Sequence, residues 1–136
     1  MKRLLSALSL LLLLAPGLLA QEIPPGVRCH ECGMKVAPES PFSAYAITEG
    51  GQKVYFCDIG DMLYHVLKRG KTGLRAMYVR DYEGGTWLSA KEAFFVRNRK
   101  AFRSPMGWAI GAFASEAEAR RWGSPVGLEG AAGLLE

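Results

Sequence analysis

The sequence predicts an α+β fold in which two small ββα-type units pack together. Short segments with the alternating pattern of β-strands are followed, twice, by a capping residue and a helical stretch. The two junctions also resemble each other: Phe56-Cys57-Asp58 and Phe113-Ala114-Ser115 each lead into an acidic residue at the third helical position. Capped helices commonly begin in this way, so an internal duplication remains open.

Residues 1–20 have the pattern of a secretory signal peptide. Lys2 and Arg3 precede an apolar run from Leu4 to Leu14, and Ala20 has the small side chain of a cleavage position. The apolar run is shorter than the roughly 20 residues of a membrane span. We therefore expect cleavage after Ala20 and a periplasmic or otherwise extracytoplasmic protein. An uncleaved segment would instead anchor it to a membrane. The expected cleavage point has no cysteine that could carry a lipid.

Residues 21–41 are predicted to form a linker and a cysteine-rich loop. The pair Pro24-Pro25 excludes a helix from the linker. Gly33, Pro38 and Pro41 interrupt the following segment, which favours a loop.

Residues 42–85 form the first predicted unit, with ββαβ order. An Asp58 cap and a terminating Gly70 bound its helix, whose Met62, Leu63, Val66 and Leu67 share an apolar face. Its predicted elements are strand Phe42–Thr48, a hairpin turn over 49–52, strand Lys53–Asp58, helix Ile59–Lys68 and strand Leu74–Arg80.

Residues 86–126 form the second predicted unit, and the Gly-rich residues 127–136 are expected to be a flexible tail. Ser115 is the expected helix cap, with Glu118 completing a capping box. The predicted elements are strands Ala93–Asn98 and Trp108–Ala114 and helix Glu116–Trp122. Between the strands lies a basic loop, Arg97–Ser104, which is most simply a solvated surface and could also dock a partner.

Charge and motifs exclude several classes of function. Removal of Lys2 and Arg3 with the signal peptide reduces the formal net charge from +4 to +2, which is too small to indicate a nucleic-acid partner. The sequence contains no phosphate loop, no supported Ser-His-Asp order and no convincing carboxylate pair. We therefore predict that the protein is not an enzyme.

The segment from Cys29 to Met34 is the strongest candidate for chemistry, because it places two thiols and a thioether within six residues. Such soft ligands select Cu(I) over hard cations. Gly33 gives the backbone the freedom to turn Cys32 and Met34 toward one point. Met106, in a turn between Pro105 and Gly107, is the best distal ligand. The predicted metal ligands are thus Cys29, Cys32, Met34 and Met106.

Other interpretations of the cysteines stay open. Cys29 and Cys32 could form a disulfide in a small secreted structural or interaction domain, or act as a redox pair in a thiol oxidoreductase. A zinc site would need a second pair of ligands, for which only Cys57 and His65 are available.

The remaining candidate side chains have simpler interpretations. We expect Cys57 to be a buried core thiol; if it faces Cys32, it becomes a third ligand or a disulfide partner. His30 could bind metal or only flank the site, and His65 is expected to be solvated.

An ordered series of motifs resembles the NosL family of copper-binding accessory proteins and covers nearly all of the mature chain. The series is Cys29-His30-Glu31-Cys32-Gly33-Met34, Tyr55-Phe56-Cys57-Asp58-Ile59-Gly60-Asp61-Met62, Met77–Tyr82 leading to Trp87, Ala93–Val96, Pro105-Met106-Gly107 and Ala112–Ser115.

The resemblance implies an exported Cu(I) carrier that helps to mature nitrous oxide reductase together with an ABC-type transporter complex. It also implies two ββα-containing units and a metal site at Cys32, Met34 and Met106, with Cys29 matching a frequent first cysteine. Many members carry a lipid-anchoring cysteine that is absent here, so another exported cuproenzyme stays open as the client.

Overall fold

The computed structural model describes residues 22–136, so the predicted signal peptide lies outside the described residues. The chain forms two small antiparallel sheets with short helices against them, which confirms the predicted α+β class. No helix within residues 22–136 is long and apolar enough to cross a membrane.

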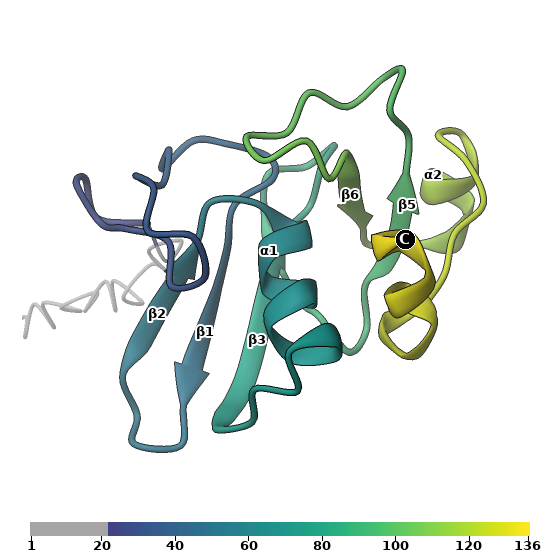
Figure 1. The fold of residues 1–136 in the computed structure, drawn as a ribbon. Coiled ribbons are helices and arrows are strands. Elements are labelled where there is room, and N and C mark those ends of the chain that lie inside the picture. Colours follow the sequence, from purple (N-terminus) through teal and green to yellow (C-terminus); the bar gives the residue numbers. More distant parts are fainter. Residues whose placement is uncertain (1–21) are drawn as a thin grey trace, which may run out of the picture.

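The first unit is built on a four-stranded antiparallel sheet with the order β2-β1-β3-β4 (Figure 1). Its strands are β1 (Ala44–Thr48), β2 (Lys53–Phe56), β3 (Leu74–Arg80) and β4 (Trp87–Ser89). The predicted hairpin turn joins β1 to β2, with Gly51 at a positive φ of 84°. The sequence pattern did not predict β4, because three residues are too few to show an alternation.

The predicted helix begins at Asp58 as expected but changes type halfway. The Asp58 carboxylate accepts a hydrogen bond from Gly60 N–H at 3.0 Å and caps α1 (Ile59–Leu63). The chain then continues as a π-helix, η1 (Tyr64–Lys68), in which Arg69 N–H donates to Tyr64 C=O. Gly70, at a φ of 61°, follows its end.

The second unit is a hairpin of β5 (Phe94–Arg97) and β6 (Ile110–Phe113), followed by α2 (Glu116–Arg120). The Ser115 hydroxyl accepts from Glu118 N–H, as the predicted cap requires. An isolated bridge between Asp81 and Ala112 and a 2.8 Å hydrogen bond from Tyr82 N–H to Ala112 C=O join β6 to the first unit.

Two apolar clusters hold the units together. The larger one lies between α1 and the first sheet and contains Phe56, Ile59, Met62 and Val79, all completely buried. The smaller, aromatic cluster packs Phe102 and Phe113 of the second unit against Phe42 of the first. Ile23, in the predicted linker, is also buried, so this segment packs against the larger cluster instead of running free.

The expectation of a flexible C-terminal tail differs from the structure. Residues Leu128–Leu135 form a 3₁₀-helix, η2, that lies beside β5 and α1 (Figure 1, yellow). Ala131 and Leu135 are buried in the larger cluster, and the Arg97 guanidinium donates to the carbonyls of Leu134 and Glu136. Apolar side chains that recur within the Gly-rich segment explain this docking.

Candidate metal centre

The cysteine-rich loop is a tight turn attached to the edge of the first sheet. Cys29 N–H donates to Met34 C=O at 2.7 Å, and Gly33 N–H donates to Cys29 C=O at 2.9 Å. Gly33 has a φ of 78°, which residues with a side chain rarely adopt. The loop reaches β2 through a bond from His30 N–H to Tyr55 C=O. This bond holds the loop against Tyr55, two residues before Cys57 in the chain.

Three cysteines and one aspartate meet at this point. The sulfur atoms of Cys29, Cys32 and Cys57 and a carboxylate oxygen of Asp61 all lie within 4.8 Å of one another. We call these four residues the Cys₃Asp cluster. The Cys32 and Cys57 sulfurs are 3.5 Å apart, and the Asp61 carboxylate accepts from the thiols of Cys29 at 3.4 Å and Cys57 at 3.6 Å. All three cysteines are free thiols, so the structure contains no Cys29–Cys32 disulfide.

Burial favours the protonated form of two thiols of the cluster, those of Cys32 and Cys57. Cys57 is 1% exposed and Cys29 is 4% exposed. Burial raises the pKa of Cys32 to about 11, with smaller contributions from Asp61 and Cys29, and it raises the pKa of Cys57 further. A metal ion that binds here must therefore displace protons from the sulfur atoms.

Asp61 is held from the side opposite the thiols. Its second carboxylate oxygen accepts a 2.8 Å hydrogen bond from the Trp108 indole N–H. Trp108 lies directly over Gly60, where a Cβ atom would come within 2.0 Å of the indole. The glycine at position 60 is therefore required for the tryptophan to reach Asp61.

A turn from the second unit closes over the start of α1. We call residues Ser104–Ala109 the methionine turn. The second carboxylate oxygen of Asp58 accepts from Met106 N–H at 2.9 Å, and Ser104 Oγ accepts from Ala109 N–H at 2.9 Å. The turn thereby lies against the residue that follows Cys57 in the chain, and its Trp108 reaches the cluster.

The two predicted methionine ligands have exposed side chains, and neither belongs to the Cys₃Asp cluster itself. Met34 is 54% exposed and Met106 is 40% exposed, and they are the exposed large hydrophobic residues of segment 22–136. Met34 N–H donates to the Cys32 thiol, and this bond partly offsets the effect of burial on the Cys32 pKa. The Met34 backbone thus contacts a member of the cluster, the Met106 backbone is bonded to Asp58 next to Cys57, and both side chains are accessible.

A polar network clamps the cysteine-rich loop to η1. The Glu31 carboxylate accepts from His65 Nδ1 at 2.7 Å and from the Arg69 guanidinium. Burial opposes ionisation of Glu31, but these two partners outweigh it and lower its pKa. The expectation of a solvated His65 is wrong: the ring is 8% exposed and packs against His30 and Phe56.

Comparison of the predicted ligands with the structure gives a mixed result. The predicted ligands Cys29 and Cys32 lie close together, and Cys57 lies beside them. Cys57 is buried, as expected, and its sulfur also faces that of Cys32. Asp61 was missed, although Cys57 and Asp61 are four residues apart around a helix start, a spacing that puts side chains on one face. Three soft thiols and a carboxylate form a donor set suited to a soft or borderline metal ion.

A comparison with known families identifies the relatives of this chain. Residues 20–127 match the model of the NosL family. The chain belongs to the NosL family. No curated protein matches the chain.

A solved structure supports the fold of this NosL family member. The crystal structure of the copper chaperone NosL from Shewanella denitrificans superposes with a TM-score of 0.71 at 23% sequence identity. The match covers 81% of this chain and 92% of the other. The two proteins therefore share their architecture over almost the whole of the relative.

Proposed function

We propose that this protein is a Cu(I) metallochaperone that holds copper at the Cys₃Asp cluster and passes it on by ligand exchange. The observation that carries the proposal is the convergence of three free thiols within 4.8 Å, in a chain of the NosL family. Thiolates bind Cu(I) in preference to hard cations, and a buried, dry site protects the ion from solvent.

Met34 and Met106 extend the proposed site toward the surface. Together with Cys29 and Cys32 they remain our proposed copper ligands, and Cys57 adds a third thiol. Their exposed thioethers need no deprotonation, so they exchange more readily than the buried sulfurs. An incoming thiolate of an acceptor would replace a thioether first and the cysteines afterwards, and copper stays in its +1 state throughout.

The proposed client is nitrous oxide reductase or its ABC-type assembly complex, and the proposed location is the periplasm or another extracytoplasmic compartment. The family membership and the signal-peptide pattern of residues 1–20 support this assignment. Intact mass measurement of protein from the exported fraction tests the location. A mass lacking residues 1–20 is expected, and a full-length mass in the cytoplasm would contradict export.

Anaerobic titration with Cu(I) in competition with a chromophoric chelator tests the binding site. We expect one-to-one binding by the reduced protein. The double variant Cys32→Ser/Cys57→Ser should lose more than about a hundred-fold in affinity, a larger loss than that of an outer-shell partner. Met77→Leu is the control, because it replaces a methionine in β3, away from the proposed ligands. It should bind Cu(I) as tightly as the parent protein.

Two outcomes would overturn the proposal. Unchanged affinity in the double variant, with its fold verified by circular dichroism, would remove the cluster as the site. Met106→Leu should retain most of the affinity but slow transfer to a thiol acceptor. An unaltered transfer rate in Met106→Leu would show that Met106 takes no part in the ligand exchange.

A further inference from the structure

The basic loop Arg97–Ser104 is held in one conformation by hydrogen bonds and by a buried side chain. Asn98 Oδ1 accepts from the N–H groups of Lys100 and Ala101, and Asn98 Nδ2 donates to Trp122 C=O. Phe102, at the centre of the loop, is buried in the aromatic cluster. The charged side chains on either side of Phe102 are therefore displayed from a fixed backbone.

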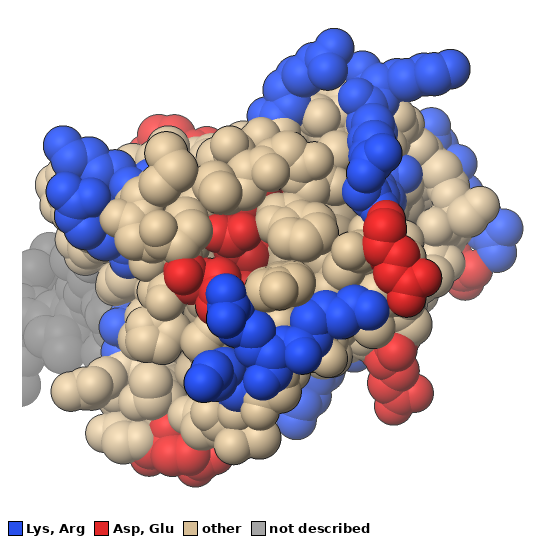
Figure 2. All heavy atoms as spheres, viewed as in Figure 1, with Lys and Arg blue, Asp and Glu red and all other residues tan. Residues whose placement is uncertain are grey.

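These cations have no acidic partner within the described chain. Arg97 is tied to the C-terminal carbonyls, but the side chains of Arg99, Lys100 and Arg103 make no hydrogen bond or ion pair with residues 22–136. Elsewhere in this segment Arg69, Arg120 and Arg121 each pair with a glutamate. Figure 2 shows Lys and Arg side chains gathered at the top, over the loop that joins β5 to β6.

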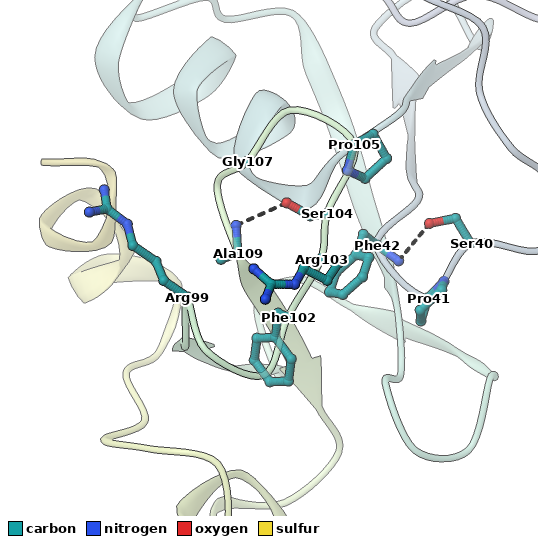
Figure 3. A pocket seen from close by; sticks show the side chains of 10 residues that line it. All are labelled: Ser40, Pro41, Phe42, Arg99, Phe102, Arg103, Ser104, Pro105, Gly107 and Ala109. Atoms are coloured by element: carbon teal, nitrogen blue, oxygen red, sulfur yellow. Dashed lines mark hydrogen bonds between the residues drawn. The ribbon is translucent and has the colours of Figure 1, made fainter.

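A pocket of about 480 Å³ lies between the basic loop and the segment that precedes β1 (Figure 3). Arg99 and Arg103 line it together with apolar side chains, among them Pro41, Phe102 and Pro105. Ser40 Oγ accepts from Phe42 N–H and holds the opposite wall. The pocket thus combines an apolar lining with the Arg103 guanidinium, and the Arg99 side chain extends away from its rim (Figure 3).

The pocket continues into the methionine turn. Pro105 and Gly107 belong to its lining, and they are the two neighbours of Met106 in the chain. Met106 N–H is bonded to Asp58, the residue next to Cys57. A polypeptide seated in this pocket would therefore lie beside the methionine turn, whose exposed Met106 is bonded through its backbone to the neighbour of Cys57.

We propose that this pocket and the side chains of Arg99, Lys100 and Arg103 form the docking surface for an acidic segment of the protein that accepts the copper. The inference rests on the proposed function and names the chemistry of the partner. Unpaired cations with an apolar floor match a polypeptide that mixes carboxylates with apolar side chains. Opposite charges would also speed the encounter between donor and acceptor.

The test uses two synthetic acceptor peptides with the same pair of cysteines. One carries a flanking run of aspartates interrupted by a leucine, and the other has asparagines in their place. We measure the rate of Cu(I) transfer from the loaded protein at low and high ionic strength. Transfer to the acidic peptide should be about ten-fold faster at low ionic strength, and the advantage should disappear as salt screens the charges.

The charge-reversed variant Arg99→Glu/Arg103→Glu should lose this advantage. The matched control is Lys71→Glu/Arg75→Glu, which makes the same change in net charge at the opposite end of the first sheet. The control should keep the advantage. Equal slowing of transfer in both variants would show that only the net charge matters, and it would overturn the docking surface. Unchanged transfer rates in both variants would overturn it as well.

Two further measurements separate this proposal from the copper site itself. Both variants should bind Cu(I) as tightly as the parent protein in the chelator competition. Fluorescence anisotropy of the labelled acidic peptide with metal-free protein tests docking even if the protein fails to bind copper. If Arg99→Glu/Arg103→Glu loses binding to phosphatidylglycerol vesicles but transfers copper to the acidic peptide normally, the surface contacts membranes and the proposal is wrong.

Discussion

At the scale of single residues, the site depends on side chains with two simultaneous partners. Asp61 accepts from buried thiols with one oxygen and from Trp108 with the other. Asp58 caps α1 with one oxygen and holds Met106 N–H with the other. Each carboxylate therefore connects segments that are more than 40 positions apart, and each is buried enough that losing a partner is costly.

A substitution at Gly60 tests the contact between Trp108 and α1. We expect Gly60→Ala to destabilise the protein by about 1–3 kcal/mol, because the new methyl group overlaps the indole and no cavity can take it. The indole fluorescence should change as Trp108 leaves Asp61. Gly133→Ala has no atom within 4 Å of the new methyl group, so it should change the stability by less than about 1 kcal/mol. Equal stability of the two variants would contradict the close contact between Trp108 and Gly60.

The raised thiol pKa values predict a dependence of stability on pH in the reduced, metal-free protein. The folded chain keeps the Cys32 proton up to a pKa of about 11, whereas the unfolded chain releases it near 9.0. The folded state thus binds more protons over this interval, and the free energy of unfolding falls as pH rises from about 9 to about 11. Chemical denaturation should show a shallower fall for Cys32→Ser/Cys57→Ser. Parallel curves would contradict protonated thiols in the folded state.

At the scale of elements, local signals were sufficient to predict the starts of α1 and α2 and every strand except β4. Asp58, Gly70 and Ser115 act on their own backbone neighbours, and the structure confirms each of them. The orientation of His65 could not be predicted in this way. His65 lies in the π-helical turn η1, and it meets Glu31, a residue 34 positions away in the chain, so the contact depends on tertiary packing.

The clamp between Glu31 and η1 predicts a kinetic effect on copper retention. Glu31→Gln removes the charge that binds Arg69 and leaves a side chain of similar shape. The cysteine-rich loop should open more often, and Cu(I) release to a chelator should accelerate roughly ten-fold, as for other outer-shell substitutions. Stopped-flow absorbance measures the release. Glu39→Gln, on an exposed neighbouring turn, is the control, and similar rates in the two variants would argue against the clamp.

At the scale of the whole molecule, the sequence predicted the α+β class and two members of the Cys₃Asp cluster. Cys29 and Cys32 were found because they are close in the chain. Cys57 was assigned to the core because its approach to Cys32 depends on how the loop pairs with β2 at Tyr55. The contact from Trp108 to Asp61 depends on the packing of the two units, which no local pattern reports.

The docked C-terminus predicts that the tail contributes to the stability of the whole fold. Leu135→Ala should lower the free energy of unfolding by about 2–5 kcal/mol, because its side chain is buried in the larger apolar cluster. Glu129→Ala, at an exposed position of the same 3₁₀-helix, should change it by less than about 0.5 kcal/mol. Thermal denaturation followed by circular dichroism compares them. A Leu135→Ala variant as stable as the control would indicate a detached tail.

The dual use of Asp58 and Asp61 has a consequence for the order in which a growing polypeptide can finish its metal site. Ribosomes make the chain from the N-terminus, so all three cysteines emerge before residue 62. The partners of the remaining carboxylate oxygens, Met106 N–H and the Trp108 indole, emerge more than 40 residues later. A nascent chain can thus gather its thiols early, but the site acquires its final shape only when synthesis is nearly complete.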